Sequence, residues 1–322
     1  MQEPLSRAEL DRVVGAAVGV PLHAVRRLTE GTFNTAYALT LGDGRELVLK
    51  VAPPPKTPLL GYEHDLLATE AMCLERFAGR VPVPDLVATG TTPGGRGFLL
   101  TSLLPGASWQ SQAAAIGPDE RAVLRHQVGR HVAAMHGVTG AAGFGHPAGP
   151  LAPSWPEAYR RIVDGLLADA ERYAVALPVP AGELRDRVAG PAVALLGVVT
   201  TPVLVHFDLW DGNVFVDLTG PRPAVTGFID AERALWADPA AELVSLALLG
   251  DIADDADFLA GYAEAGGPVV LDDATRARLH LYRVLLALVM VVEAVPRATA
   301  VPAHAEWDAR VADWLVRELG EL

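Results

Sequence analysis

The chain has 322 residues, 51% of them hydrophobic and 20% charged, so it can bury a sizeable core and is neither a mini-protein nor a disordered segment. Its 26 lysines and arginines against 39 aspartates and glutamates give a formal net charge of -13, which argues against a nucleic acid as partner. With one cysteine, Cys73, and no apolar run longer than Val284–Val292, the sequence predicts a cytoplasmic protein that has no disulfide framework and no membrane segment.

The first part of the chain alternates between strand and turn patterns. Strands are predicted over residues 28–37, 38–41, 46–51, 83–90 and 97–104, with Gly- and Pro-rich turns between several of them. Apolar residues at helical spacing predict helices over residues 5–18 and 66–77. We therefore expect an antiparallel sheet that carries a helix among its strands, and a boundary where Pro105 and Gly106 end the last strand.

Helical patterns dominate the rest of the chain. Helices are predicted over residues 118–135, 155–174, 184–196, 240–249, 256–264, 275–292 and 305–319. Three short β-prone runs interrupt them, over residues 203–206, 213–217 and 224–229. The sequence thus predicts an α+β protein in which a small antiparallel-sheet lobe precedes a larger, mainly helical lobe.

Polar residues gather at the ends of the three short runs. Asp208 is expected in a turn, Asn213 at the start of the next strand and Asp230 at the end of its hairpin partner, so all three face one cleft. Phosphoryl transfer needs one carboxylate that accepts a hydroxyl proton and an oxygen-rich pair that holds Mg²⁺ against a triphosphate. The alternative is that these are ordinary turn and strand-end residues, which Asp and Asn also favour.

The spacing of His206, Asp208 and Asn213, followed by an apolar strand that ends in Asp230, resembles the aminoglycoside phosphotransferase and choline kinase-like family. The resemblance implies a protein-kinase-like bilobal fold. It places a nucleotide-binding lobe over residues 1–101, a hinge over 102–106 and a catalytic and acceptor-binding lobe over 107–322. His206 is expected to hold the catalytic loop by hydrogen bonding rather than to take part in the chemistry.

A further stretch, residues 237–243, resembles the Gly-Asp-Pro stretch of the same family and a later acid. Asp238 is expected to brace the loop or to cap the helix that follows Pro239. Two departures are visible, because Phe207 stands where the family often has glycine and Glu242 where it often has aspartate.

The resemblance implies roles for the residues of the motif. Asp208 would orient and deprotonate the acceptor hydroxyl, while Asn213 and Asp230 would bind Mg²⁺. A lysine on a strand of the first lobe would position the phosphates, and Lys50 lies in an apolar run where a long cation is otherwise hard to explain. Glu70 on the following helix is the expected partner of Lys50, although a solvated position is an alternative for Glu70 and a strand-edge position for Lys50.

The same resemblance implies a site for ATP or GTP between the lobes. Gly31, Thr32 and Asn34 would cover the triphosphate, although a single glycine is a weak signature and an ordinary hairpin loop is the alternative. Ser102, Leu103 and Leu104 would meet the base through main-chain groups, between the apolar side chains of Val48, Phe215 and Ile229. Each of those apolar residues could equally belong to the core.

The acceptor is expected to be a small molecule with a hydroxyl group, most readily an aminoglycoside-like antibiotic. Five acids in the helical lobe suit a cationic acceptor, and a solvated helix face is the alternative for them: Asp251, Asp254, Asp255, Asp257 and Glu264. Another acceptor, such as a ketosamine, a choline-like compound, homoserine, a sugar, a macrolide or a nucleoside, is the second interpretation. The third is a pseudokinase that binds nucleotide without turnover.

Overall fold

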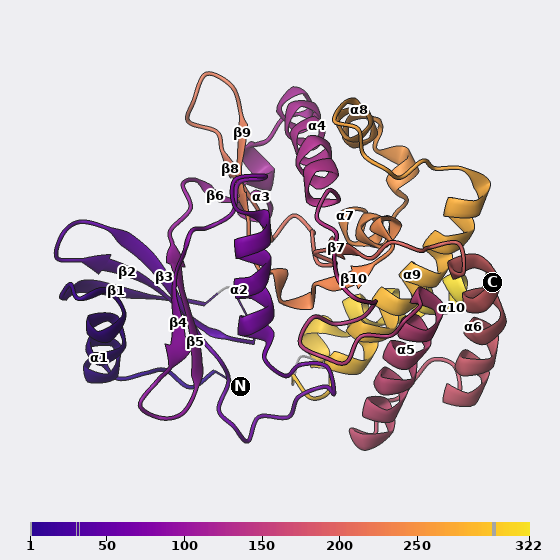
Figure 1. Cartoon of the computed structure of the whole chain (residues 1–322), viewed down its shortest axis with the longest axis horizontal. Helices are drawn as coiled ribbons and strands as arrows, with labels where there is room; N and C mark the ends of the chain where they lie inside the picture. Colours follow the sequence, from indigo (N-terminus) through magenta and orange to yellow (C-terminus); the bar gives the residue numbers. More distant parts are fainter. Residues whose placement is uncertain (1, 30, 32, 298–300) are drawn as a thin grey trace.

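The computed structural model describes residues 2–29, 31, 33–297 and 301–322. Its first part is a five-stranded antiparallel sheet in the order β1-β2-β3-β5-β4 (Figure 1). The strands are β1 (Leu22–Leu28), β2 (Thr35–Leu41), β3 (Glu46–Val51), β4 (Leu86–Thr91) and β5 (Gly97–Ser102), and the helices are α1 (Arg7–Val18) and α2 (Leu66–Phe77). The predicted antiparallel sheet lobe is confirmed.

The two faces of β3 carry different side chains because successive residues of a strand point to opposite sides. Leu47, Leu49 and Val51 are buried in a cluster with residues of α1. Val48 and Lys50 lie on the opposite face, and Leu99, which pairs with Lys50 across the strands, packs with residues of α2. The strand therefore presents Lys50 toward α2.

The position of the first strand differs from the prediction. β1 covers Leu22–Leu28, and residues 28–37 are not one strand. β1 is an edge strand that pairs only with β2, so its charged side chains remain in solvent and give it a weak strand pattern. The prediction was wrong because an edge strand does not need the apolar alternation that marks a buried strand.

The second part of the chain is mainly helical (Figure 1). Its helices are α3 (Trp109–Gln112), α4 (Pro118–Met135), α5 (Trp155–Arg172), α6 (Ala181–Leu196), α7 (Leu243–Leu246), α8 (Ala256–Glu264), α9 (Asp273–Glu293) and α10 (Ala305–Gly320). Its strands are β6 (Ala107–Ser108), β7 (Val203–Val205), β8 (Val214–Asp217), β9 (Ala224–Phe228) and β10 (Leu235–Ala237). They form two small antiparallel sheets, β6-β8-β9 and β10-β7. The predicted order of a sheet lobe and a helical lobe is confirmed.

The helix predicted over residues 240–249 is much shorter than expected. A 3-10 turn, η3 (Pro239–Glu242), precedes α7, which ends at Leu246, and Leu249 has a left-handed φ of 62°. Asp238 caps this turn through a 3.0 Å bond from the Ala240 N–H. The second carboxylate oxygen of Asp238 accepts from Arg278 at 2.9 Å and from the Tyr282 hydroxyl at 2.7 Å. The turn is thereby fixed to α9.

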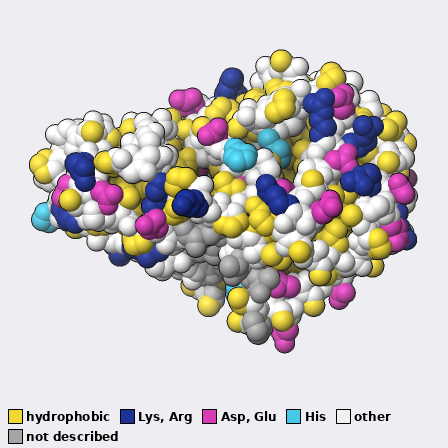
Figure 2. All heavy atoms as spheres, turned by 90° about the horizontal axis from the view of Figure 1, so that it is seen from below, with side chains coloured by type: hydrophobic (Ala, Val, Ile, Leu, Met, Phe, Trp, Pro, Cys, Tyr) yellow, Lys and Arg dark blue, Asp and Glu magenta, His cyan; other side chains and the backbone are white. Residues whose placement is uncertain are grey.

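Charged side chains of both signs are interspersed on the face seen in Figure 2. None of the described helices combines the length and the apolar character that a membrane-spanning segment requires.

The buried side chain of His136, at the end of α4, gives the fold a dependence on pH. Its Nδ1 lies 2.7 Å from the Tyr262 hydroxyl, and burial lowers the pKa of His136 to about 3. The unfolded chain has a histidine pKa of about 6.5, so the unfolded state binds more protons between these values and the free energy of unfolding falls as the pH falls. The contribution of His136 should therefore decrease by ~1 kcal/mol per pH unit below pH ~6.5.

Urea unfolding of the wild type and of His136→Gln at pH 7, 6 and 5 tests this expectation. The variant should lose less stability than the wild type as the pH falls, because its side chain does not titrate. Equal slopes for the two proteins would contradict it.

Candidate active site

Asp208, Asn213 and Asp230, the three polar residues of the motif, lie together at one end of the β8–β9 hairpin. Val214 pairs with Phe228, and the Ile229 N–H donates to the Asn213 carbonyl at 3.1 Å, which brings the residues before β8 beside those after β9. The Asn213 amide nitrogen donates to the Asp208 carbonyl at 2.8 Å and lies 3.2 Å from Asp208 Oδ2. Because the nitrogen of the amide is used in this way, its oxygen is the atom that can bind a cation.

Buried side chains hold the loop that carries Asp208. Glu242 accepts from the backbone N–H groups of His206 at 2.6 Å and of Phe207 at 2.9 Å. His206 Nε2 donates to the Ile229 carbonyl at 2.8 Å, and burial lowers the pKa of His206 to about 4, so the ring is neutral. The hydrogen bond by which His206 was expected to hold the loop is present. The Ser245 hydroxyl accepts from the Leu209 N–H at 3.0 Å and completes the brace.

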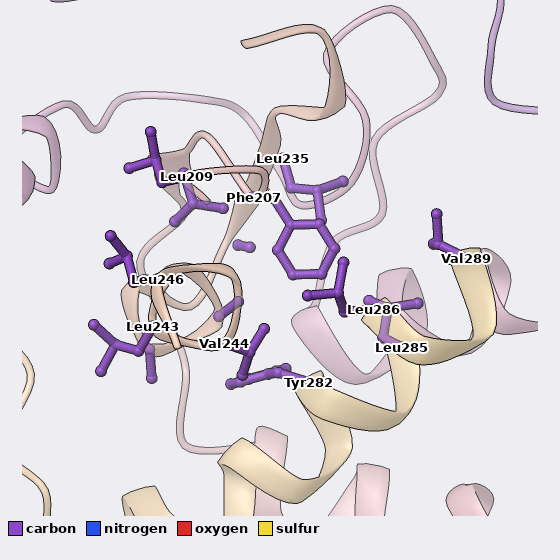
Figure 3. Packing of buried hydrophobic residues seen from close by; sticks show 14 of the residues in the cluster. Phe207, Leu209, Leu235, Leu243, Val244, Leu246, Tyr282, Leu285, Leu286 and Val289 are labelled. Atoms are coloured by element: carbon purple, nitrogen blue, oxygen red, sulfur yellow. The ribbon is translucent and has the colours of Figure 1, made fainter. Parts of the chain in front are cut away.

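Phe207 has a left-handed φ of 62°, a conformation that glycine adopts without strain. A phenylalanine in this conformation is strained by ~1–2 kcal/mol. Its ring is buried, and Figure 3 shows it between Leu235 and Leu286. Burial of an aromatic side chain contributes ~1.5–3 kcal/mol, which offsets the strain and ties the loop to the core of the helical lobe.

The carboxylate of Asp208 lies in a buried and charged environment. Burial raises its pKa to about 6, although Arg233 acts in the opposite direction. The Arg233 Nη1 atom lies 3.8 Å from Asp208 Oδ1, and its Nη2 atom bonds both oxygens of Glu293 at 2.9 and 2.8 Å. At neutral pH the Asp208 carboxylate is therefore mostly ionised, as a group that accepts a proton must be.

Lys50 connects the sheet to the hairpin. Its ammonium lies 2.6 Å from Glu70 Oε1 and also contacts Asp230 Oδ1. Burial acts to lower the pKa of Lys50, but the carboxylates of Asp230 and Glu70 outweigh burial and raise it above its ordinary value. The structure thus brings Lys50, Glu70 and Asp230 together, and it leaves Glu75 exposed on the other side of α2.

Glu232 is a site residue that the sequence reasoning missed. Its carboxylate, with those of Glu70 and Asp230, supplies oxygen atoms that lie within 4.8 Å of one another, and this group could hold a metal ion. Asn34 donates to Glu232 Oε2 at 2.7 Å, so the loop after β1 reaches the segment after β9. The sequence signal for Glu232 is its position two residues after Asp230. Mg²⁺ prefers carboxylate and amide oxygens, and the carboxylates of Asp230 and Glu232 with the amide oxygen of Asn213 fit such an ion, while Glu70 is bonded to Lys50.

The residues expected around the nucleotide base lie between the sheet and the hairpin. Leu104 packs against Gly227 of β9, and Gly227 pairs with Phe215 of β8. The side chains of Leu104 and Phe215 therefore lie close to each other. Ser102 ends β5, and the Leu103 N–H donates to the Glu46 carbonyl at 3.2 Å, so this main-chain donor is already engaged. Val48, Phe215 and Ile229 are half-buried, whereas most of the core is fully buried.

The loop after β1 is held by Gln2 at two of its described residues. Gly31 is exposed, and its carbonyl accepts from the Gln2 side chain at 2.6 Å. The Asn34 carbonyl accepts from the same amide at 2.8 Å. Thr32, which was expected to cover the triphosphate, lies outside the described residues.

The acids expected to attract a cationic acceptor are largely engaged within the protein. Asp255 bonds Arg125 at 2.6 Å and caps α8, and Asp251 lies 3.1 Å from Arg283. Glu264 lies 2.9 Å from His126 Nε2 and contacts Arg130. Helix capping and ion pairing account for these three carboxylates, so they give less support to a polycationic acceptor than the sequence indicated.

A model of the phosphotransferase enzyme family matches residues 24–282, which span most of the chain and contain the hairpin, Lys50 and Glu70. The chain therefore belongs to the phosphotransferase enzyme family. The family resemblance read from the motif is confirmed.

Solved structures share the fold over nearly the whole chain. A Thermobifida fusca protein assigned as a fructosamine-3-kinase is 23% identical, with a TM-score of 0.68 over 97% of this chain and 100% of that chain. A thermostable mutant of aminoglycoside phosphotransferase APH(4)-Ia, in a complex with ADP and hygromycin B, is 20% identical, with a TM-score of 0.66 over 96% and 98%. The macrolide 2'-phosphotransferase MphH from Brachybacterium faecium is 22% identical, with a TM-score of 0.61 over 94% and 97%. At these identities the likeness shows the fold.

Among curated proteins, a subtelomeric hrmA-associated cluster protein of Aspergillus fumigatus is 30% identical over 101 residues. The matched region is 30% of this chain and 19% of that protein, and a second strain of the same fungus gives the same match. The chain thus matches about a fifth of the length of these relatives.

Proposed function

We propose that this protein transfers the γ-phosphoryl group of ATP or GTP to a hydroxyl group of a small molecule. The observation that carries the proposal is the contact of Lys50 with both Glu70 and Asp230, which joins the sheet lobe to the end of the hairpin beside the loop that carries Asp208. Phosphoryl transfer depends on positioning and on neutralising charge, and this arrangement provides a cation and carboxylates for both.

Each residue of the site has a distinct proposed role. Asp208 orients the acceptor hydroxyl and takes its proton, and Lys50, held by Glu70, positions the α- and β-phosphates. Asn213 and Asp230 would hold Mg²⁺, which when bound neutralises charge on the triphosphate. The hinge residues, with Val48, Phe215 and Ile229, are proposed to enclose the base, and Gly31, Thr32 and Asn34 to cover the phosphates.

Lys50→Ala should weaken nucleotide use and leave the protein folded. A hydrogen bond from a charged group contributes ~1.5–3 kcal/mol, so the KM for nucleotide should rise about 10- to 100-fold. Lys56→Ala is the matched control, because Lys56 is the other lysine of the chain and its side chain is exposed. Steady-state kinetics with both variants decide the assignment, and an unchanged KM in Lys50→Ala would remove Lys50 from the site.

An antibiotic is the proposed acceptor class, because APH(4)-Ia and MphH are named for phosphotransfer with aminoglycosides and macrolides. A ketosamine is the second candidate, and the Thermobifida fusca protein favours it through its similar fold and coverage. Asp251, Asp255 and Glu264 pair with cationic side chains of the protein, which weakens the charge argument for a polycation, so macrolides belong in the same screen.

A coupled assay of ADP or GDP release across aminoglycosides, macrolides, ketosamines, choline-like compounds, homoserine, sugars and nucleosides tests the proposal. Mass spectrometry should find one acceptor heavier by a single phosphoryl group. Nucleotide binding without release of nucleoside diphosphate for any acceptor would indicate a pseudokinase. Failure to bind nucleotide at all would contradict the proposed function.

A further inference from the structure

The segment of residues 2–5 lies against the loop after β1 and forms contacts that have no assigned role. The amide nitrogen of Gln2 donates to the carbonyl oxygens of Gly31 at 2.6 Å and of Asn34 at 2.8 Å. The amide oxygen of Gln2 accepts from Arg27 of β1 at 2.7 Å. One side chain therefore binds two described residues of the loop, Gly31 and Asn34, and is itself oriented by Arg27 of the strand that leads into the loop.

This segment is fixed to the sheet independently of Gln2. The Glu3 carbonyl accepts from Arg96 Nη1 at 2.7 Å, and the Leu5 N–H donates to the Tyr37 hydroxyl at 2.6 Å. Arg96 also donates to the Ala52 carbonyl at 2.6 Å, next to the end of β3. Arg96 and Tyr37 are both buried. Because these contacts remain when Gln2 is changed, the backbone of the segment should keep its place in a Gln2 variant.

The loop is also held from the side of the hairpin. The Asn34 side chain donates to Glu232, two residues after Asp230, while its backbone carbonyl accepts from Gln2. Asn34 is thus fixed between the segment of residues 2–5 and the segment that carries the proposed metal ligand. A loop that already has its bound conformation loses less conformational entropy when the ligand binds, so its affinity is higher.

We propose that Gln2 is a positioning residue for the nucleotide: it holds the backbone carbonyls of Gly31 and Asn34 in place, so that these two residues can face the triphosphate. This inference rests on the proposed function, and it adds a residue from outside the phosphotransferase family match, which begins at residue 24. Gln2 acts through the loop and does not itself contact the nucleotide.

Two variants of the full chain test the role of Gln2. Gln2→Glu keeps the acceptor for Arg27 and loses both donations to the loop, and Gln2→Ala loses all three bonds. Calorimetry with Mg²⁺–AMP-PNP should show that the Kd rises about five- to tenfold in both variants, as the loss of two hydrogen bonds to the loop predicts. Hydrogen exchange of a peptide covering residues 28–37 should be faster in both variants without nucleotide.

Glu9→Ala is the matched control. Glu9 forms a capping box with Ser6 at the start of α1 and does not touch the loop, so this variant should lower Tm by a few degrees and leave the Kd unchanged. Gln2→Glu and Gln2→Ala should instead raise the Kd and leave the Tm unchanged.

If the wild type bound Mg²⁺–AMP-PNP and both Gln2 variants bound it equally well, the role of Gln2 would be wrong and the proposed function would stand. If the wild type did not bind, the proposed function itself would be refuted. Unchanged hydrogen exchange in the loop would overturn the positioning role without reference to nucleotide.

Discussion

Asp208→Asn should reduce kcat by a factor on the order of 10²–10⁴ and leave the affinity for Mg²⁺-nucleotide within about twofold, because an amide cannot take the hydroxyl proton. The substitution preserves the shape of the side chain, and Asn213 still has the Asp208 carbonyl as an acceptor. Rapid-quench measurement of phosphoryl transfer, with calorimetry of nucleotide binding, checks both halves of the expectation.

Asp230→Asn is the matched comparison, because it makes the same chemical change, carboxylate to amide, at the second aspartate of the site. Its proposed role is to hold Mg²⁺, so the Kd for Mg²⁺-nucleotide should rise at least about tenfold. The two variants should therefore separate binding from turnover. Near-normal turnover in Asp208→Asn, or normal metal-dependent binding in Asp230→Asn, would mean that the roles are assigned wrongly.

Glu242→Ala should lower the free energy of unfolding by ~2–4 kcal/mol, because two buried backbone N–H groups lose their partner. These are the N–H groups of His206 and Phe207, in the loop that carries Asp208. Burial raises the pKa of Glu242 to about 7, and the two N–H donors oppose that change. Urea unfolding gives the stability, and kcat should fall as well because the loop loses its brace.

Two further variants make the Glu242 result specific. Glu242→Gln keeps one acceptor oxygen for the two donors, so its free energy of unfolding should lie between that of the wild type and that of Glu242→Ala. Glu75→Ala removes an exposed carboxylate on α2 and should change stability by less than ~0.5 kcal/mol. A wild-type stability in Glu242→Ala would show that the loop does not depend on this carboxylate.

The sequence alone indicated the site residues whose type is unusual for their surroundings in the chain. A lysine in an apolar strand is expensive to bury, so Lys50 stood out, and the turn that carries Asp208 stood out because its polar residues lie between apolar runs. The long helices were predicted closely, as with α2 at Leu66–Phe77, because their apolar spacing extends over several turns.

Other features leave no local pattern, because only tertiary contacts define them. Glu232 looks like any acid until η2 (Ala231–Arg233) packs against α2 and places it beside Glu70. Gln2 is an unremarkable polar residue, and its two bonds reach about thirty positions along the chain. Glu242 reads as part of a helix, yet the short turn η3 directs it to the loop before β8. Only the three-dimensional structure identifies such partners.

The left-handed backbone of Phe207 and its buried ring have a consequence for mutational scanning. Selection for activity should be sensitive to substitutions at Leu235 and Leu286 as well as to substitutions of the site residues, since both leucines flank the ring that fixes the loop (Figure 3). Evolution of a new acceptor preference could then proceed through the interior of the helical lobe, by small shifts of the loop, without any exchange among the residues that meet the substrates. Libraries restricted to the residues that meet the substrates would not sample that route.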